Sequence, residues 1–250
     1  MREFLKAAAI SAALLLAAPQ QAAAAGPVKN IVLVHGAWAD GSGWRAVYDI
    51  LVKDGYKVSV VANPDTAVAE DVAATQRVLD RQDGPVILVG HSYGGVVITE
   101  AGVDPKVVGL VYIAAFAPDV GETAGQFLTG GPPPIEVSKD GVAFLKHDAF
   151  LGGFAPDVPL ADRQFMADSQ VPIAVATLST PITKAAWKTK PSWYLVAAND
   201  QVIPPAAERN FAKRMKATTR EVASSHVAYV SQPAVTAKLI EDAANGFKGP

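Results

Sequence analysis

The order of apolar and amphipathic segments constrains the fold of this chain most strongly. Short runs rich in Val, Ile and Leu occur at residues 30–35, 57–62, 85–90, 107–114, 192–198 and 218–222. These runs are nearly continuous rather than alternating, which is typical of strands covered on both faces. Amphipathic segments predict helices at residues 43–53, 68–81, 94–101, 205–216 and 232–245. The alternation predicts an α/β domain with a mostly parallel, twisted sheet and helices on both of its faces.

Charge and cysteine content exclude several classes of function. The 250 residues include 22 Lys and Arg against 24 Asp and Glu, a net charge of −2. Because no basic surplus is present to neutralise phosphates, we expect no nucleic-acid partner. The chain has no cysteine, so disulfides, thiolate nucleophiles and Cys-ligated metals are excluded. Its four histidines form no HxxxH or HExxH pair, so we expect no metal site.

Residues 1–25 have the features of a secretory signal peptide. Arg2 and Lys6 precede an apolar run at residues 7–18, which is shorter than the roughly 20 residues that a membrane-spanning helix needs. Alanines at residues 22–25 then offer a cleavage site before Gly26. A buried N-terminal helix is the alternative. We predict an exported protein, periplasmic or secreted, whose mature chain begins near Gly26 and carries no stable membrane anchor.

A long segment interrupts the strand–helix alternation. From Pro118 to Pro191 the chain is rich in Pro and Gly and shows no clear strand. Excursions of this length in compact domains are usually functional or disordered. Large apolar residues such as Phe144, Phe150 and Phe165 are scattered through it and argue against plain disorder. We therefore predict one domain at residues 26–250, with a helical cap or lid at about 119–190.

The segment GHSYGG at residues 90–95 is the strongest chemical signal. It follows a predicted buried strand and opens a predicted helix, which is the context that a G-x-S-x-G nucleophile turn requires. The glycines two residues before and after Ser92 let the strand and the helix approach closely in a strained turn. A glycine-rich turn without chemistry is the alternative. We predict that Ser92 is a nucleophile.

A serine nucleophile needs a general base, and the base needs an orienting acid. In this arrangement the expected chain order is Ser, then Asp or Glu, then His. His226 follows the last predicted strand, whereas His147 lies within the predicted lid between charged residues. We predict that His226 is the base. A capping or packing role is the alternative for this residue.

Two aspartates could serve as the acid. Asp200 and Asp119 each follow a predicted strand, and sites in α/β proteins form at the carboxyl ends of strands. Asp200 precedes His226 by one helix and one strand, so we favour it. For Asp119 we favour capping of the first lid helix, with Glu122 three residues later.

Acyl transfer also requires donors for the developing oxyanion. One donor should be the backbone N–H after the nucleophile, that of Tyr93. The loop after the first predicted strand should supply the second donor, and Ala37 is our candidate. We expect His35 to order this loop by hydrogen bonds. Trp38 is a candidate substrate-binding residue, although core packing would explain it equally well.

Taken together, these segments resemble the α/β-hydrolase superfamily over essentially all of residues 28–246. Within it, the similarity is to the branch of small bacterial esterases, plant methylesterases and hydroxynitrile lyases. The matching segments are VHGAW at 34–38, GHSYGG at 90–95, FAPD at 116–119, NDQVIP at 199–204 and SH at 225–226. The resemblance implies a triad of Ser92, Asp200 and His226, and a helical cap at roughly residues 119–190. It also implies that Asp200, rather than Asp119, is the acid.

This sequence departs from the hydroxynitrile lyases at two positions. Those enzymes have a Thr in the first oxyanion loop and a Lys directly after the catalytic His, where this chain has Gly36 and Val227. Without that ammonium group a leaving cyanide lacks its electrostatic stabiliser. Ester hydrolysis is therefore favoured over lyase activity.

Three hypotheses for function follow. The first is a serine hydrolase that cleaves a small, fairly hydrophobic carboxylic ester through an acyl-enzyme, with no cofactor. The second keeps the fold but changes the chemistry to cofactor-free, haloperoxidase-like perhydrolysis or to lyase activity. The third is a non-catalytic ligand-binding homologue, since fold does not fix function.

Overall fold

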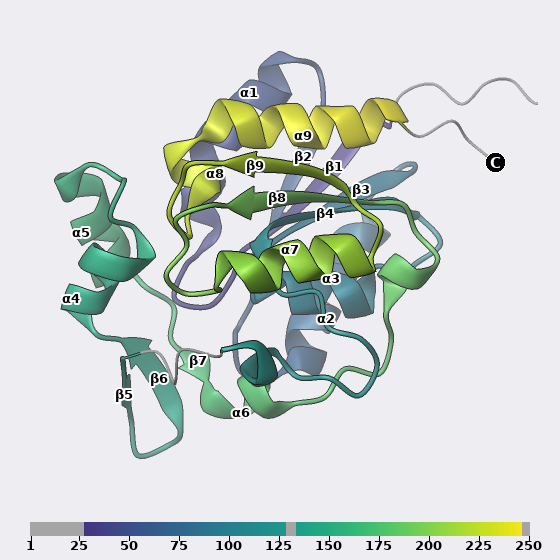
Figure 1. Ribbon diagram of the computed structural model, residues 1–250. Coiled ribbons are helices and arrows are strands. Elements are labelled where there is room, and N and C mark those ends of the chain that lie inside the picture. The colour runs from purple at the N-terminus through teal and green to yellow at the C-terminus, as the bar shows by residue number, and fades with distance from the viewer. Residues whose placement is uncertain (1–27, 129–133, 247–250) are drawn as a thin grey trace, which may run out of the picture.

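A six-stranded parallel sheet forms the centre of the molecule. The computed structural model describes residues 28–128 and 134–246, and its main sheet has the strand order β2-β1-β3-β4-β8-β9 (Figure 1). The strands are β1 (Asn30–Val34), β2 (Lys57–Val61), β3 (Val86–Ser92), β4 (Val107–Ala115), β8 (Ser192–Ala197) and β9 (Thr218–Val222). All six predicted strands are present, and the predicted α/β fold is confirmed.

Burial differs between the centre and the edges of this sheet. Every residue of β1, β3 and β8 is buried, as continuous apolar runs require. The edge strand β9 differs from the prediction of a strand covered on both faces, because four of its five residues are exposed. Its Arg220 pairs with Asp242 and its Glu221 pairs with Arg209. Charged side chains of this kind protect an open sheet edge from pairing with another chain.

Helices cover both faces of the sheet, as predicted. Figure 1 shows α1 and α9 on one face and α2, α3 and α7 on the other. The helices of this part are α1 (Arg45–Lys53), α2 (Val68–Asp80), α3 (Gly94–Ala101), α7 (Pro205–Arg214), α8 (Ala228–Ser231) and α9 (Pro233–Gly246), with a 3-10 turn, η1 (Gly41–Trp44), before α1. On α1, the inward-facing Val47 and Leu51 lie one helical turn apart and are fully buried.

The cap segment, residues 119–190, is built mostly from short elements, apart from the nine-residue helix α5. Its helical turns are η2 (Ala124–Phe127), α4 (His147–Ala149), a π-helical turn η3 (Phe150–Phe154), α5 (Leu160–Asp168), α6 (Val175–Ser179) and η4 (Ala186–Lys188). It also contains an antiparallel sheet of β5 (Ile135–Val137), β6 (Val142–Leu145) and β7 (Ile173–Ala174). The expectation that this segment has no strand was wrong. Strands of two to four residues are too short to produce a readable apolar pattern.

The part of the cap that contains α4 and α5 lies beyond the carboxyl ends of the strands. Figure 1 shows β8 and β9 pointing toward the side of the molecule where α4 and α5 lie. The predicted signal peptide, residues 1–25, lies outside the described residues. Among the helices of residues 28–128 and 134–246, none is long and apolar enough to cross a membrane.

Candidate active site

Ser92 lies at the sharp turn between β3 and α3. Its backbone has φ of +53°, a left-handed conformation that costs a non-glycine residue energy. The turn depends on close approach of its two arms. A Cβ on Gly90 would lie 2.6 Å from the carbonyl oxygen of Gly94, and one on Gly94 would lie 2.6 Å from the carbonyl oxygen of His35. Only glycine fits at these two positions, as the sequence motif indicated.

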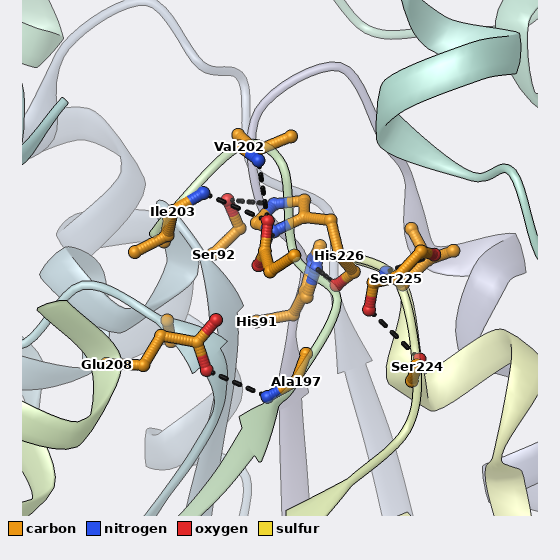
Figure 2. A network of polar contacts seen from close by, with 12 residues as sticks. His91, Ser92, Ala197, Val202, Ile203, Glu208, Ser224, Ser225 and His226 are labelled. Carbon is orange, nitrogen blue, oxygen red and sulfur yellow. Dashed lines mark hydrogen bonds and ion pairs between the residues drawn. The ribbon is translucent and has the colours of Figure 1, made fainter. Parts of the chain in front are cut away.

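Three of the predicted site residues meet at this turn. His226 Nε2 lies 2.8 Å from Ser92 Oγ, and His226 Nδ1 lies 2.6 Å from Asp200 Oδ2. The other carboxylate oxygen of Asp200 accepts the N–H groups of Val202 at 2.6 Å and Ile203 at 3.0 Å (Figure 2). Because Asp200 is held by its own turn and both imidazole nitrogens are engaged, His226 is oriented to take a proton from Ser92.

The alternative acid and base lie elsewhere. Asp119 forms an ion pair with Lys188, and His147 is half exposed near Asp168. Glu122 accepts the N–H of Asp119, as expected. However, the first turn of the cap, η2, is capped by Thr123 and Gln126, so the expected helix-capping role of Asp119 was wrong.

The loop after β1 lies against Ser92. A Cβ on Gly36 would be 2.6 Å from Ser92 Cβ, so the neighbouring Ala37 lies close to the nucleophile. His35 orders this loop, as expected. Its Nδ1 bonds the carbonyl of Gly36 and its Nε2 accepts the N–H of Asn63. Burial lowers the pKa of His35, consistent with a neutral ring that donates from Nδ1. The oxyanion roles of Ala37 and Tyr93 stay predictions.

Trp38 joins the core to the cap. Its indole Nε1 donates to the carbonyl of Ala143, and its backbone N–H donates to the carbonyl of Val171. The hollow that it lines, beside Met166 and Tyr229, has a volume of about 10 Å³. That is room for about one water molecule. A substrate-binding role of Trp38 stays a prediction and would need the cap to move.

The cap closes over the candidate site. Ser92 is 4% exposed and His226 is fully buried. The ring of Phe154 packs edge-on against the His226 ring, with 5.0 Å between centroids. Asp157 accepts hydrogen bonds from the backbone N–H and the hydroxyl of Ser225, directly before His226. The cap therefore holds the loop that carries the base.

Sequence reasoning missed His91. Its Nε2 lies 3.0 Å from the backbone carbonyl of His226 (Figure 2). Its ring packs on Tyr229 and Phe154. Burial and the nearby His226 ring hold the pKa of His91 well below its usual range. The neutral ring thus donates to the main chain of His226 and supports its position. Its place next to Ser92 was the only signal in the sequence.

A cavity of about 330 Å³ lies between the cap and the loop that follows β8. Its walls include Leu145, Ala149 and Phe154 from the cap, and Gln201 and Val202 from the Asp200 turn. Within the described ranges, no group of three or more His, Asp or Glu is placed to hold a metal ion. Val227, directly after His226, is fully buried and supplies no charge.

Comparisons with known proteins agree with this architecture. A profile of the alpha/beta hydrolase family matches residues 31–239. An alpha/beta hydrolase from Aspergillus novofumigatus is 29% identical over 239 residues, covering 86% of this chain and 96% of that protein. A pyrethroid hydrolase from Sphingobium wenxiniae is 28% identical over 254 residues, which cover 87% of this chain and 88% of that hydrolase. A methylesterase from Arabidopsis superposes with a TM-score of 0.72 at 20% identity, over 88% of this chain and 100% of the other. The chain belongs to the alpha/beta hydrolase family.

Proposed function

We propose that the protein is a serine esterase that cleaves small, fairly hydrophobic carboxylic esters through an acyl-enzyme. The observation that carries this proposal is the continuous chain of contacts from Ser92 Oγ to His226 Nε2 at 2.8 Å and from His226 Nδ1 to Asp200 Oδ2 at 2.6 Å. The protein is further proposed to be exported, on the basis of residues 1–25.

In the first half-reaction, Ser92 Oγ forms a bond to the ester carbonyl carbon while His226 Nε2 takes the hydroxyl proton. The carbonyl oxygen becomes an oxyanion, for which the N–H groups of Ala37 and Tyr93 are the proposed donors. His226 then gives the proton to the leaving alcohol as the carbon–oxygen bond breaks. Throughout, Asp200 stabilises the imidazolium form of His226.

In the second half-reaction, water attacks the acyl-enzyme. His226 takes a proton from this water and returns it to Ser92 Oγ as the carboxylic acid leaves. The net reaction consumes one ester and one water and yields one acid and one alcohol. None of these steps requires a cofactor.

The proposed substrate class is supported by the cavity and by a relative. Apolar side chains such as Leu145, Ala149 and Val202 contribute to the walls of the cavity of about 330 Å³ beside the Asp200 turn. Ligand pockets of this kind are mostly apolar, with a few polar groups that fix orientation. The Sphingobium relative is a pyrethroid hydrolase, which is consistent with an apolar ester.

The test uses the chain from Gly26, as wild type, as Ser92→Ala and as Ser179→Ala, an exposed serine of the cap. Hydrolysis of p-nitrophenyl acetate, butyrate and octanoate is followed near neutral pH. We expect turnover by wild type and Ser179→Ala, and a loss of at least about 1000-fold in Ser92→Ala. Equal rates in wild type and Ser92→Ala on every ester would contradict the proposal.

A further inference from the structure

A buried carboxyl group lies beside the triad and has no step in the mechanism above. Glu208, in the first turn of α7, is fully buried. Its Oε2 accepts the backbone N–H of Ala197 at 3.0 Å (Figure 2). Ala197 is the last residue of β8, and Asp200 lies in the turn that follows. Glu208 thus connects α7 to the start of the turn that carries Asp200.

The second oxygen of Glu208, Oε1, is buried without a donor among the described residues. The carboxyl group of Asp200 lies within hydrogen-bonding reach of Glu208. Two carboxylate groups in contact repel each other unless one proton lies between them. One of the two groups must therefore be protonated.

The surroundings indicate which group carries the proton. Asp200 accepts two backbone N–H groups and faces His226, whereas Glu208 accepts a single N–H. Burial and the neighbouring Asp200 raise the pKa of Glu208 well above its usual range. Burial raises the pKa of Tyr194 of β8, whose hydroxyl bonds the main chain of Ala115, and Arg209 on α7 is paired with Glu221 at the surface.

We propose that Glu208 is a positioning residue, whose protonated carboxyl group donates Oε1–H to Asp200 while accepting from Ala197 N–H, and so holds Asp200 against His226. This inference rests on the proposed esterase mechanism. A neutral donor stabilises the Asp200 anion without adding a second negative charge beneath the imidazole. No bond is made or broken at Glu208 during turnover.

Two substitutions separate this role from a general structural one. Glu208→Gln keeps both hydrogen bonds, since its NH₂ group donates and its carbonyl accepts, but it cannot ionise. Glu208→Met keeps an unbranched chain of similar length and loses both bonds. Glu100→Gln is the matched control, because Glu100 is also buried but bonds Thr183 of the cap segment.

The measured quantity is the rate at which a fluorophosphonate labels Ser92, as a function of pH, which reports nucleophile activation without depending on the ester. For Glu208→Gln we expect a labelling rate within about 3-fold of wild type. The acid limb of the profile, where the rate falls as the pH is lowered, should stay at the same pH, because the carboxyl group of Glu208 is already neutral in the wild type. For Glu208→Met, folded by circular dichroism, we expect a loss of about 10- to 100-fold, the scale of one hydrogen bond to a charged group. Glu100→Gln should behave as wild type.

Three results would overturn the inference. One is a folded Glu208→Met variant that is labelled as fast as wild type. Another is a Glu208→Gln variant as slow as Glu208→Met. The third is an acid limb that moves to lower pH in Glu208→Gln, which would mean that Glu208 is ionised in the wild type.

Failure of the proposed function has a different signature. If Ser92 is not labelled in any variant, the esterase proposal fails, and the protonation of Glu208 is then decided by infrared spectroscopy. A protonated-carboxyl band in the wild-type minus Glu208→Gln difference spectrum at neutral pH supports the proton assignment, because the band of any other protonated carboxyl group cancels. Its absence from that difference spectrum overturns the assignment.

Discussion

The main sheet and the cap segment differ in what determines their structure. The central strands of the sheet are fully buried and pair in parallel, so burial of apolar side chains specifies them. In the cap, by contrast, strands have two to four residues and several large apolar side chains are exposed. These are Val120, Val137, Phe144, Leu160 and Phe165, between 42% and 63% exposed. Hydrogen bonds and a smaller set of buried apolar side chains, among them Phe150, Phe154 and Trp187, fasten this segment to the rest of the domain.

This difference separates two roles within the site. The proposed nucleophile, base and acid come from turns at the ends of β3, β9 and β8, where the rigid sheet determines their spacing. The cap covers them and contacts the base loop through Phe154 and Asp157. We therefore expect substitutions in the sheet-borne residues to abolish chemistry, and substitutions in the cap to tune it.

The largest effect should come from the acid. Asp200→Asn keeps the size of the side chain but removes the charge that holds His226 in the correct tautomer. We expect kcat/KM for p-nitrophenyl butyrate to fall by about 10⁴-fold. Asp119→Asn is the control, since Asp119 pairs with Lys188 and not with His226. Similar losses in the two variants would show that this assignment of the acid is wrong.

An intermediate effect should come from the bond between the cap and the base loop. Asp157→Ala removes both acceptors of Ser225, and we expect kcat/KM to fall by about 10-fold. Asp162→Ala, at an exposed position on α5, should leave it unchanged. Equal activity in the two variants would mean that the cap does not position the base.

The pKa of Asp157 adds a condition to this prediction. Burial acts to raise that pKa, but hydrogen bonds from Ser225 outweigh it and lower the pKa below its usual range. Asp157 is therefore ionised above about pH 5 in folded and unfolded chains alike. Its contribution to the free energy of unfolding should be constant there and decline only as the pH falls through the lowered pKa. Urea unfolding of Asp157→Ala and wild type, from neutral pH down through the lowered pKa, measures this contribution to the free energy of unfolding.

A further effect, on stability rather than on activity, should come from Asp65. Asp65 is fully buried at a backbone φ of +54°, and its carboxylate oxygens have no partner in the described part of the chain. Burial and the neighbouring Asp71 raise the pKa of Asp65 to about 9. Between about pH 4 and this value the unfolded chain binds fewer protons than the folded one, so Asp65 destabilises the protein increasingly as the pH rises.

Asp65→Asn removes this pH-dependent destabilisation, because an amide does not ionise, and Asn tolerates the left-handed backbone. We expect a higher Tm at neutral pH, by roughly 2–4 °C for each 1 kcal/mol gained in a chain of this size, with little gain near pH 4. Differential scanning calorimetry at the two pH values measures the change. A gain of equal size at both pH values would show that Asp65 is not held neutral in the folded protein.

The regions also differ in how far sequence predicts them. The ends of all six main strands lie within two residues of the predicted ones. For the central strands the reason is that buried apolar runs and glycine turns are local signals. Ser92, His226 and Asp200 could be selected from chain order and position at strand ends. The strands of the cap could not be predicted, because segments of two to four residues are too short to show a periodic apolar pattern.

The supporting residues of the site were missed for a related reason. His91 bonds the main chain of His226, 135 residues away, and Asp157 bonds Ser225 across 68 residues. Glu208 appears in sequence as an ordinary acidic residue in the first turn of a helix, where negative charge is favoured. Only the burial of its carboxyl group beside Asp200 distinguishes it.

The central claim is that Ser92 is an activated nucleophile. Its most direct test is incubation of the chain from Gly26 with a fluorophosphonate, followed by intact-mass measurement and peptide mapping. We expect one adduct per chain, on the peptide that contains Ser92, and none in Ser92→Ala. No adduct in the folded wild type, or an adduct on another residue, would contradict it.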